Sequence, residues 1–184
     1  KGMARPTKRK AVVSMKFFEK DSPLLRSGMM GPVVLQKIPT DAEQPSTEEE
    51  LRIKHGKHQV YGVLSTPDND QKRHPIVIVS HGFNGTHHHG RNYFKMLNEL
   101  GYMCYTFDFP CGGTGSRTDN NTVNMSVPDE QKTLEAIVRY FKSRPDVDKK
   151  NIVLLGESQG GLISALTAAK MKKDIRKLVL VFPA

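Results

Sequence analysis

From residue 75 onward, short apolar runs alternate with longer amphipathic stretches, and this alternation limits the folds open to the chain. The apolar runs are rich in β-branched residues and predict buried strands, whereas apolar residues at helical spacing predict helices between them. The predicted strands are Pro75–Ser80, Tyr102–Phe109, Asn151–Leu155 and Lys177–Phe182, and the predicted helices are Asn92–Leu100, Pro128–Lys142 and Gln159–Lys172. Strands joined through helices form a parallel sheet with helices on both faces, so we expect an α/β fold.

Two of these helices have a definite apolar stripe, which indicates the face that packs on the sheet. The stripe of the first consists of Tyr93, Met96, Leu97 and Leu100, and that of the second consists of Leu134, Ile137, Val138 and Phe141. In open sheets of this kind, ligands bind at the carboxyl ends of the strands. The loops that begin at residues 80, 109 and 155 are therefore where we expect the chemistry.

The chain before residue 75 divides into an irregular part and a hairpin. Residues 1–45 contain five prolines and no periodicity, which predicts an irregular, basic N-terminal extension. Leu51–Lys54 and Gln59–Ser65 flank Gly56 and predict two antiparallel strands with a turn between them. We therefore expect the folded domain to span residues 46–184, with a mostly parallel sheet.

The net charge of +9 raises the question of a nucleic-acid partner. Residues 1–20 hold seven Lys or Arg and one Glu, so this segment carries a net charge of +6. The basic residues are not interleaved with aromatic ones, and no zinc-ligand spacing accompanies them. We therefore expect a solvated extension and no nucleic-acid partner, with nucleic-acid binding through the extension as an alternative.

The sequence also bears on the location of the protein. No apolar run approaches the ~20 residues that span a bilayer. Residues 11–18 follow a basic stretch, as in a signal peptide, but Lys16 and the charges at 19–21 interrupt the apolar part. Cys104 and Cys111 give no disulfide framework, and Cys104 is expected to pack inside a strand. We expect a cytoplasmic protein with no membrane association, and the initial Lys indicates an N-terminus that is missing or processed.

A Gly-x-Ser-x-Gly turn follows the third of the strands. Gly156-Glu157-Ser158-Gln159-Gly160-Gly161 lies between a predicted strand and a predicted helix, which is the setting of a nucleophilic serine. The glycines allow strand and helix to approach closely, and the helix N-terminus favours negative charge beside the serine. Ser158 is therefore the predicted nucleophile.

A second loop predicts the hydrogen-bond donors that acyl transfer needs. His81-Gly82-Phe83-Asn84-Gly85 follows the strand Pro75–Ser80. An oxyanion hole requires two N–H groups directed at the developing charge. In this arrangement we expect them to be the backbone N–H groups of Phe83 and Gln159.

The histidines of this region are not expected to serve as base or as metal ligands. His81 lies at the base of the oxyanion loop, where a structural hydrogen-bonding role is favoured over that of a general base. Three consecutive side chains, His87, His88 and His89, do not easily converge on one ion, so we expect a solvated or substrate-facing loop there. No metal and no cofactor is expected, because side chains and water suffice for this chemistry.

Together these motifs resemble the α/β-hydrolase superfamily, and most closely the feruloyl/cinnamoyl esterases and the serine aminopeptidase-like hydrolases. The resemblance covers residues 50–184 and includes Phe107-Asp108-Phe109 and Gly113-Thr114-Gly115-Ser116. It implies a Ser–His–Asp triad in which Ser158 attacks an ester carbonyl and forms an acyl-enzyme. Asp108 matches a motif position at a strand end and is assigned a structural role.

The chain departs from that pattern at two places. Glu157 stands where the esterase group often has His, which leaves the substrate class open. In these folds the acid and the base follow the serine, but after Ser158 this chain has only Asp174 and no histidine. The triad Asp and His are therefore not present in this chain, and we expect a fold truncated after about the sixth strand and a fragment inactive alone.

Several functions remain open at this point. The first is an esterase acting on a small-molecule ester, the second is a peptidase or aminopeptidase on the same scaffold, and the third is a non-catalytic hydrolase-like binding protein. One fold supports all three, so the fold alone does not separate them. Oligomeric state is not readable from the sequence.

Overall fold

The computed structural model describes residues 11–14, 34–37, 45–119 and 122–184 of the chain. It divides into two compact units, Lys1–Glu43 and Gln44–Ala184. In the first unit, β1 (Ala11–Ser14) pairs with β2 (Val34–Lys37) in antiparallel fashion, with Ala11 opposite Lys37. The sequence predicted only an irregular extension here, but Val12 and Val13 in β1 and Val34 in β2 are β-branched residues, which favour extended backbone. The basic residues 1–10 lie outside the described residues.

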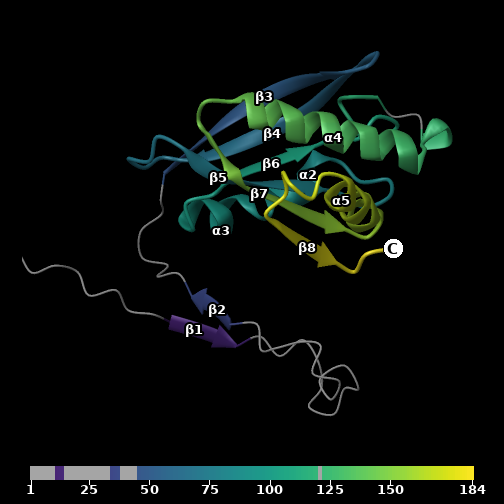
Figure 1. Cartoon of the computed structure of the whole chain (residues 1–184). Helices are drawn as coiled ribbons and strands as arrows, with labels where there is room; N and C mark the ends of the chain where they lie inside the picture. Colours follow the sequence, from purple (N-terminus) through teal and green to yellow (C-terminus); the bar gives the residue numbers. More distant parts are fainter. Residues whose placement is uncertain (1–10, 15–33, 38–44, 120–121) are drawn as a thin grey trace, which may run out of the picture. The chain divides into compact units, whose positions relative to one another are not determined.

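The second unit contains a six-stranded sheet in the order β3-β4-β6-β5-β7-β8 (Figure 1). Its strands are β3 (Ser46–His55), β4 (His58–Pro67), β5 (His74–Ser80), β6 (Met103–Phe107), β7 (Val147–Glu157) and β8 (Lys177–Val181). The strands β6, β5, β7 and β8 run parallel, whereas β3 and β4 form an antiparallel hairpin at one edge. The predicted hairpin and the mostly parallel sheet are therefore confirmed.

Helices cover both faces of this sheet, as predicted. They are α2 (His87–Arg91), α3 (Phe94–Glu99), α4 (Val127–Ser143) and α5 (Gln159–Lys170), with a short 3₁₀ turn at Thr122–Asn124. Alternate residues of β5 point to opposite faces: Ile76 and Ile78 pack in a core with α4 and α5, whereas Val77 and Val79 pack in a core with α3. Figure 1 shows α4 and α5 side by side on one face.

The apolar stripe was predicted correctly for one helix and in part for another. All four stripe residues of α4 are buried, as the sequence indicated. In α3 the buried residues are Phe94, Leu97 and Asn98, whereas Met96 and Leu100 are exposed. The buried residues of α3 keep the i, i+3, i+4 spacing of a helix, but they define a face that is rotated relative to the predicted stripe.

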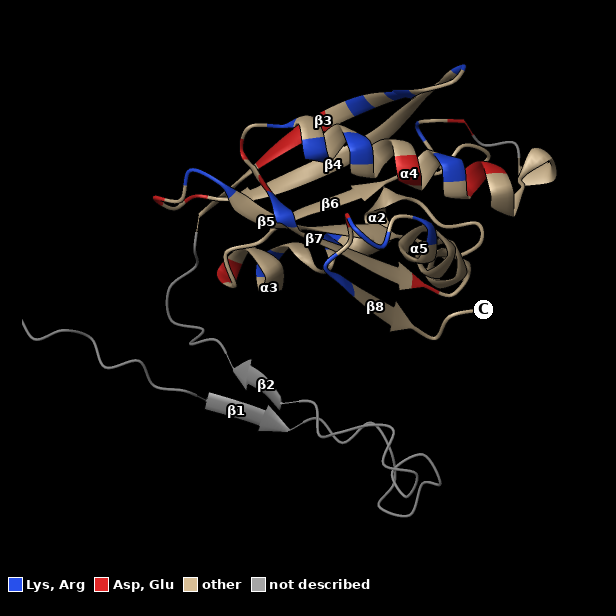
Figure 2. Ribbon diagram, viewed as in Figure 1, with Lys and Arg blue, Asp and Glu red and all other residues tan. Residues whose placement is uncertain are grey.

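The start of α4 brings two acidic residues to the carboxyl edge of the sheet. The Ser126 hydroxyl accepts a hydrogen bond from the Asp129 N–H, and Pro128 lies in the first turn. Asp129 and Glu130 follow in that turn, where the positive end of the helix dipole favours negative charge (Figure 2).

Candidate active site

Ser158 lies at the junction where β7 ends and α5 begins, and its side chain is exposed. Its φ of 48° is in the left-handed region, which an L-residue adopts only when its surroundings hold it there. The Ser158 N–H donates to the Val181 carbonyl at 3.0 Å, and the Ser158 carbonyl accepts from the Gly161 N–H at 2.8 Å. The predicted nucleophile therefore sits on a strained strand–helix turn with its side chain accessible.

The glycines around this turn are required by close backbone contacts. A Cβ on Gly160 would overlap the carbonyl oxygens of Ser80, which ends β5, and of His81, which follows it. A Cβ on Gly156 would overlap the carbonyl of Gly160. Larger residues would therefore push α5 away from the sheet and displace Ser158.

The loop after β5 passes directly beside the serine. A Cβ on Gly82 would stand 3.1 Å from the Ser158 Cβ and 3.7 Å from its Oγ. Phe83, the next residue, is 62% exposed, and Asn84 has a φ of 55°. The structure thus brings the segment of Phe83 next to Ser158 and Gln159, while the use of their N–H groups as oxyanion donors stays a prediction.

His81 holds this loop through both of its ring nitrogens. Nδ1 donates to the Gly82 carbonyl at 2.7 Å, and Nε2 accepts from the Phe109 N–H at 3.2 Å. The ring is 3% exposed, and burial lowers its pKa. A neutral ring with both nitrogens engaged has none left for a serine hydroxyl, which agrees with a structural role.

A buried His87–Asp108 pair was missed in the sequence. The His triplet was expected to form a solvated or substrate-facing loop, but His87 begins α2 and is 3% exposed. Asp108 Oδ1 accepts from the His87 backbone N–H at 2.6 Å and lies 2.9 Å from His87 Nδ1. Asp108 Oδ2 accepts from the Arg117 N–H at 2.7 Å. The segment is therefore a helix and not the expected loop, and His87 is buried because it binds the carboxylate after β6, whereas His88 and His89 are exposed to solvent as expected.

Gln159 connects the serine turn to α4. Its side-chain Nε2 donates to Glu130 Oε2 at 2.6 Å and lies 3.3 Å from the Met125 sulfur. Glu130 is 4% exposed, and burial raises its pKa to about 7. The sequence did not single out Glu130, because only the fold brings the first turn of α4 to Gln159, the residue after Ser158.

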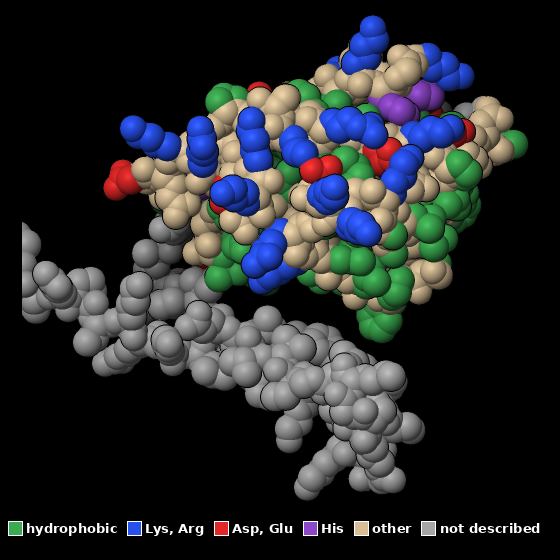
Figure 3. All heavy atoms as spheres, viewed as in Figure 1, with side chains coloured by type: hydrophobic (Ala, Val, Ile, Leu, Met, Phe, Trp, Pro, Cys, Tyr) green, Lys and Arg blue, Asp and Glu red, His purple; other side chains and the backbone are tan. Residues whose placement is uncertain are grey.

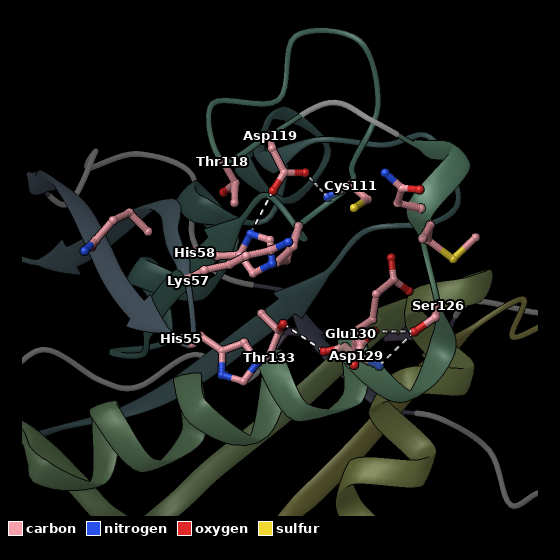
Figure 4. Close-up of a pocket in the computed structure, with 15 residues that line it drawn as sticks. His55, Lys57, His58, Cys111, Thr118, Asp119, Ser126, Asp129, Glu130 and Thr133 are labelled. Carbon is pink, nitrogen blue, oxygen red and sulfur yellow. Dashed lines mark hydrogen bonds and ion pairs between the residues drawn. The ribbon is translucent and has the colours of Figure 1, made fainter.

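Glu130 also lines a pocket of about 750 Å³ at this edge of the sheet (Figure 4). The turn between β3 and β4, the loop after β6 and the start of α4 form its walls. Its lining includes the His58–Asp119 ion pair, whose two side chains are 2.9 Å apart. Ser158 is not among the lining residues, so Glu130 and Gln159 provide the link from this pocket to Ser158.

Glu157, the other departure from the resembling family, is tied to α3. Its carboxylate accepts a 2.6 Å hydrogen bond from the Tyr93 hydroxyl. Burial and this carboxylate raise the pKa of Tyr93. Glu157 thus connects the end of β7 to the start of α3, which lies on the opposite face of the sheet from α5.

Asp174 and Ser158 lie at opposite ends of the parallel strands. Asp174 precedes β8, at the amino end of the parallel strands, whereas Ser158 follows the carboxyl end of β7. Its carboxylate pairs with Lys142 beside a hollow of about 410 Å³, which is lined mainly by basic residues. Figure 3 shows further Lys and Arg side chains spread over the face that carries α4. Asp174 therefore belongs to this basic region and not to the serine site.

Metal ligands and membrane spans were also sought among the described residues. In those ranges, no three His, Cys, Asp or Glu side chains are grouped so that they could hold a metal ion. The helices between residues 45 and 184, where described, are all too short or too polar to cross a bilayer.

The fold and this site define an α/β-hydrolase. Residues 75–183 match the family described as alpha/beta hydrolase fold, so the chain belongs to that family. The match begins at β5 and includes the Gly82 loop, the Ser158 turn and β8.

Among curated proteins, the chain is similar to a candidate esterase/lipase of Mycoplasma pneumoniae, with 27% identity over 113 residues. It is also similar to the proline iminopeptidase PfmaB of Pestalotiopsis fici, with 30% identity over 108 residues. These matches cover 61% and 58% of this chain, but 39% and 35% of the two relatives. The chain therefore spans well under half the length of these relatives.

Among solved structures, the chain is similar to Est1E of Butyrivibrio proteoclasticus, which was determined with ferulic acid bound. The TM-score is 0.62 at 27% identity, over 68% of this chain and 49% of Est1E. The predicted resemblance to esterases and aminopeptidase-like hydrolases is confirmed by these relatives.

Proposed function

We propose that the protein is a serine hydrolase that cleaves carboxylic esters through an acyl-enzyme on Ser158. The observation that carries this proposal is the exposed Ser158 side chain, held at a φ of 48° against the Gly82 loop. A strained serine between a strand and a helix, with a backbone loop beside it, is the arrangement of an activated nucleophile and its oxyanion hole.

In the proposed reaction, Ser158 Oγ forms a bond to the acyl carbon and gives its proton to a base. The carbonyl oxygen becomes an oxyanion, which the N–H groups of Phe83 and Gln159 stabilise by hydrogen bonds. Collapse of this intermediate breaks the bond to the leaving oxygen, which takes the proton from the base and departs as the alcohol. Water then gives a proton to the base and attacks the acyl-enzyme, and the acid is released as Ser158 Oγ takes that proton back. The positive end of α5, at Gln159, favours the charge in both steps.

None of the described residues near Ser158 is assigned as the base or the acid of a triad. Residues 159–184 contain Asp174 and no histidine, and Asp174 lies in the basic region at the other end of the strands. His81 has both ring nitrogens engaged. We therefore place the base and acid outside these 184 residues, and expect the 184-residue chain alone to have little turnover.

Peptide-bond cleavage is the second candidate, and the similarity to a proline iminopeptidase favours it. The esterase reading is supported by the Mycoplasma relative and by Est1E with its ferulic acid. Both reactions use the same nucleophile and oxyanion donors, so the groups that bind the substrate decide between them.

Full-length protein assayed with p-nitrophenyl acetate, a feruloyl ester and prolyl p-nitroanilide tests the proposal. We expect ester hydrolysis that Ser158→Ala abolishes. Cleavage of the anilide alone would favour the peptidase, and no cleavage of any substrate would favour a non-catalytic binding protein.

The remaining parts of the proposal concern partners and location. We propose a small-molecule ester as the partner, with no nucleic acid and no membrane, in the cytoplasm. The free thiols of Cys104 and Cys111 support a reducing compartment.

A further inference from the structure

Glu130 is a buried acid with an unusual set of neighbours. Its side chain rises from the first turn of α4 toward the pocket, and its one hydrogen-bond partner among the described residues is Gln159 (Figure 4). No Lys, Arg or His of the described chain forms an ion pair with it. Burying an ionised carboxyl group without a cation lowers the stability of the fold. A neutral glutamine at position 130 would accept the same hydrogen bond without that cost.

Burial is the main cause of the shifted titration of Glu130. It raises the pKa to about 7, and the hydrogen bond from Gln159 opposes that rise. A carboxyl group that costs stability and titrates near neutral pH, in a pocket next to a nucleophile, is typical of a functional group.

Other titratable groups line the same pocket, and they come from each element that packs around it. His55 ends β3, His58 begins β4 and Lys57 lies in the turn between them, whereas Cys111 and Asp119 come from the loop after β6. His58 and Asp119 pair with one another.

On α4 itself, Asp129 pairs with Lys132 and accepts from Ser126, so it too is engaged away from Glu130. From α5, Gln159 is the residue that meets the acid. The protonation of Glu130 is therefore governed by its burial and by Gln159.

Gln159 has two roles at the serine turn. Its side chain is held by Glu130 at 2.6 Å, and its backbone N–H begins α5 directly after Ser158. Fixing the side chain limits the rotation of the peptide group that precedes it, so the direction of that N–H depends on the anchor. A donor misdirected by even a fraction of an ångström stabilises an oxyanion less well.

We propose that Glu130, in its ionised form, is a positioning residue that holds Gln159 so that its backbone N–H is directed at the oxyanion beside Ser158. This inference rests on the proposed function. A carboxylate accepts a stronger hydrogen bond from the amide than a protonated carboxyl group does, so the anchor tightens as the pH rises through about 7. The pH profile of Ser158 reactivity then contains a rise that is caused by ionisation of Glu130 and not by ionisation of the catalytic base.

The test follows two signals across pH 5–9 in the full-length protein. The first is the NMR signal of the Gln159 side-chain amide, and the second is the rate at which a fluorophosphonate probe labels Ser158. We expect the amide signal to move with a midpoint near pH 7, and the labelling rate to rise with the same midpoint. Glu130→Gln should remove this step and hold the rate near the low-pH level of the wild type at every pH, because its neutral amide oxygen accepts a weaker hydrogen bond from Gln159. Glu130→Leu should lower the rate about tenfold at pH 8.

Asp129→Asn, on the same helical turn, is the matched control and should leave the midpoint unchanged. Circular dichroism establishes that each variant is folded, and Glu130→Gln keeps the test decisive where Glu130→Leu does not fold. If the wild type is labelled and Glu130→Gln has the same pH profile, the role of Glu130 is overturned and the proposed function is not. Absence of labelling at every pH would overturn the proposed function, and the inference with it.

Discussion

Gly82 stands against Ser158 so closely that a Cβ in its place would lie 3.1 Å from the Ser158 Cβ. The two residues are far apart in the chain and meet because β5 and β7 are neighbours, with Ser80 opposite Gly156 in the parallel register. The loop that leaves β5 and the turn that leaves β7 therefore emerge side by side, and the candidate site is a product of that register.

This contact predicts the effect of Gly82→Ala. The added methyl would crowd the Ser158 side chain and shift the loop that carries Phe83, so we expect labelling of Ser158 to slow by about a hundredfold or more. The loop is partly exposed, so unfolding free energy should change by less than about 1 kcal/mol. Gly56→Ala, at an open turn with a φ of 56°, should show the opposite pattern: reduced stability and unchanged labelling. Equal labelling by Gly82→Ala and the wild type would contradict the placement of the loop.

The backbone conformation of Ser158 predicts a difference in stability between two variants that both lack the hydroxyl. Ser158→Gly and Ser158→Ala both remove the hydroxyl, but only glycine is relaxed at a φ of 48°. We expect Ser158→Gly to be more stable than Ser158→Ala by about 1 kcal/mol in chemical denaturation. Two variants of equal stability would show that the turn is not strained.

The pKa of Glu130 predicts how stability depends on pH. In the unfolded chain the carboxyl group has its ordinary pKa of 4.5, and in the folded chain burial raises it to about 7. The folded state therefore favours the neutral acid. The contribution of Glu130 to the free energy of unfolding is fully present below pH 4.5 and is lost as the pH rises through 7. Glu130→Gln should leave stability near pH 4.5 unchanged and raise it by roughly 2–3 kcal/mol at pH 8. Denaturation curves at the two pH values measure this, and an equal effect at both would contradict it.

Asp108 is predicted to support the fold rather than the reaction. It is fully buried and accepts hydrogen bonds from His87 and from the Arg117 N–H. In Asp108→Asn an NH₂ group would face one of these donors, so we expect a loss of about 2–4 kcal/mol. The exposed Asp70→Asn is the control and should be near neutral. Labelling per folded molecule should be unchanged in both variants, and a selective loss of labelling in Asp108→Asn would assign it a role in catalysis.

The periodicity of the sequence was sufficient to predict the sheet and most of its helices. The continuous apolar runs of β5 and β7 and the apolar stripe of α4 are local patterns, and the burial of these elements in the fold follows them. The setting of Ser158 was also readable, because a strand, a glycine-rich turn and a helix are contiguous in the chain.

The partners across the sheet could not be predicted in the same way. His87 reads as one of three similar histidines until the fold brings it to Asp108 at the end of β6. Glu130 reads as an ordinary acidic residue of a helix start until α4 packs beside Gln159. Both relationships depend on which strands are neighbours, which local spacing does not encode.

Mass-spectrometric mapping of a fluorophosphonate adduct on the full-length protein is the most direct test of the central claim. The account predicts one modified peptide, with the phosphonate on Ser158, and no adduct in Ser158→Ala. An adduct on another residue, or none on a folded wild-type protein, would contradict it.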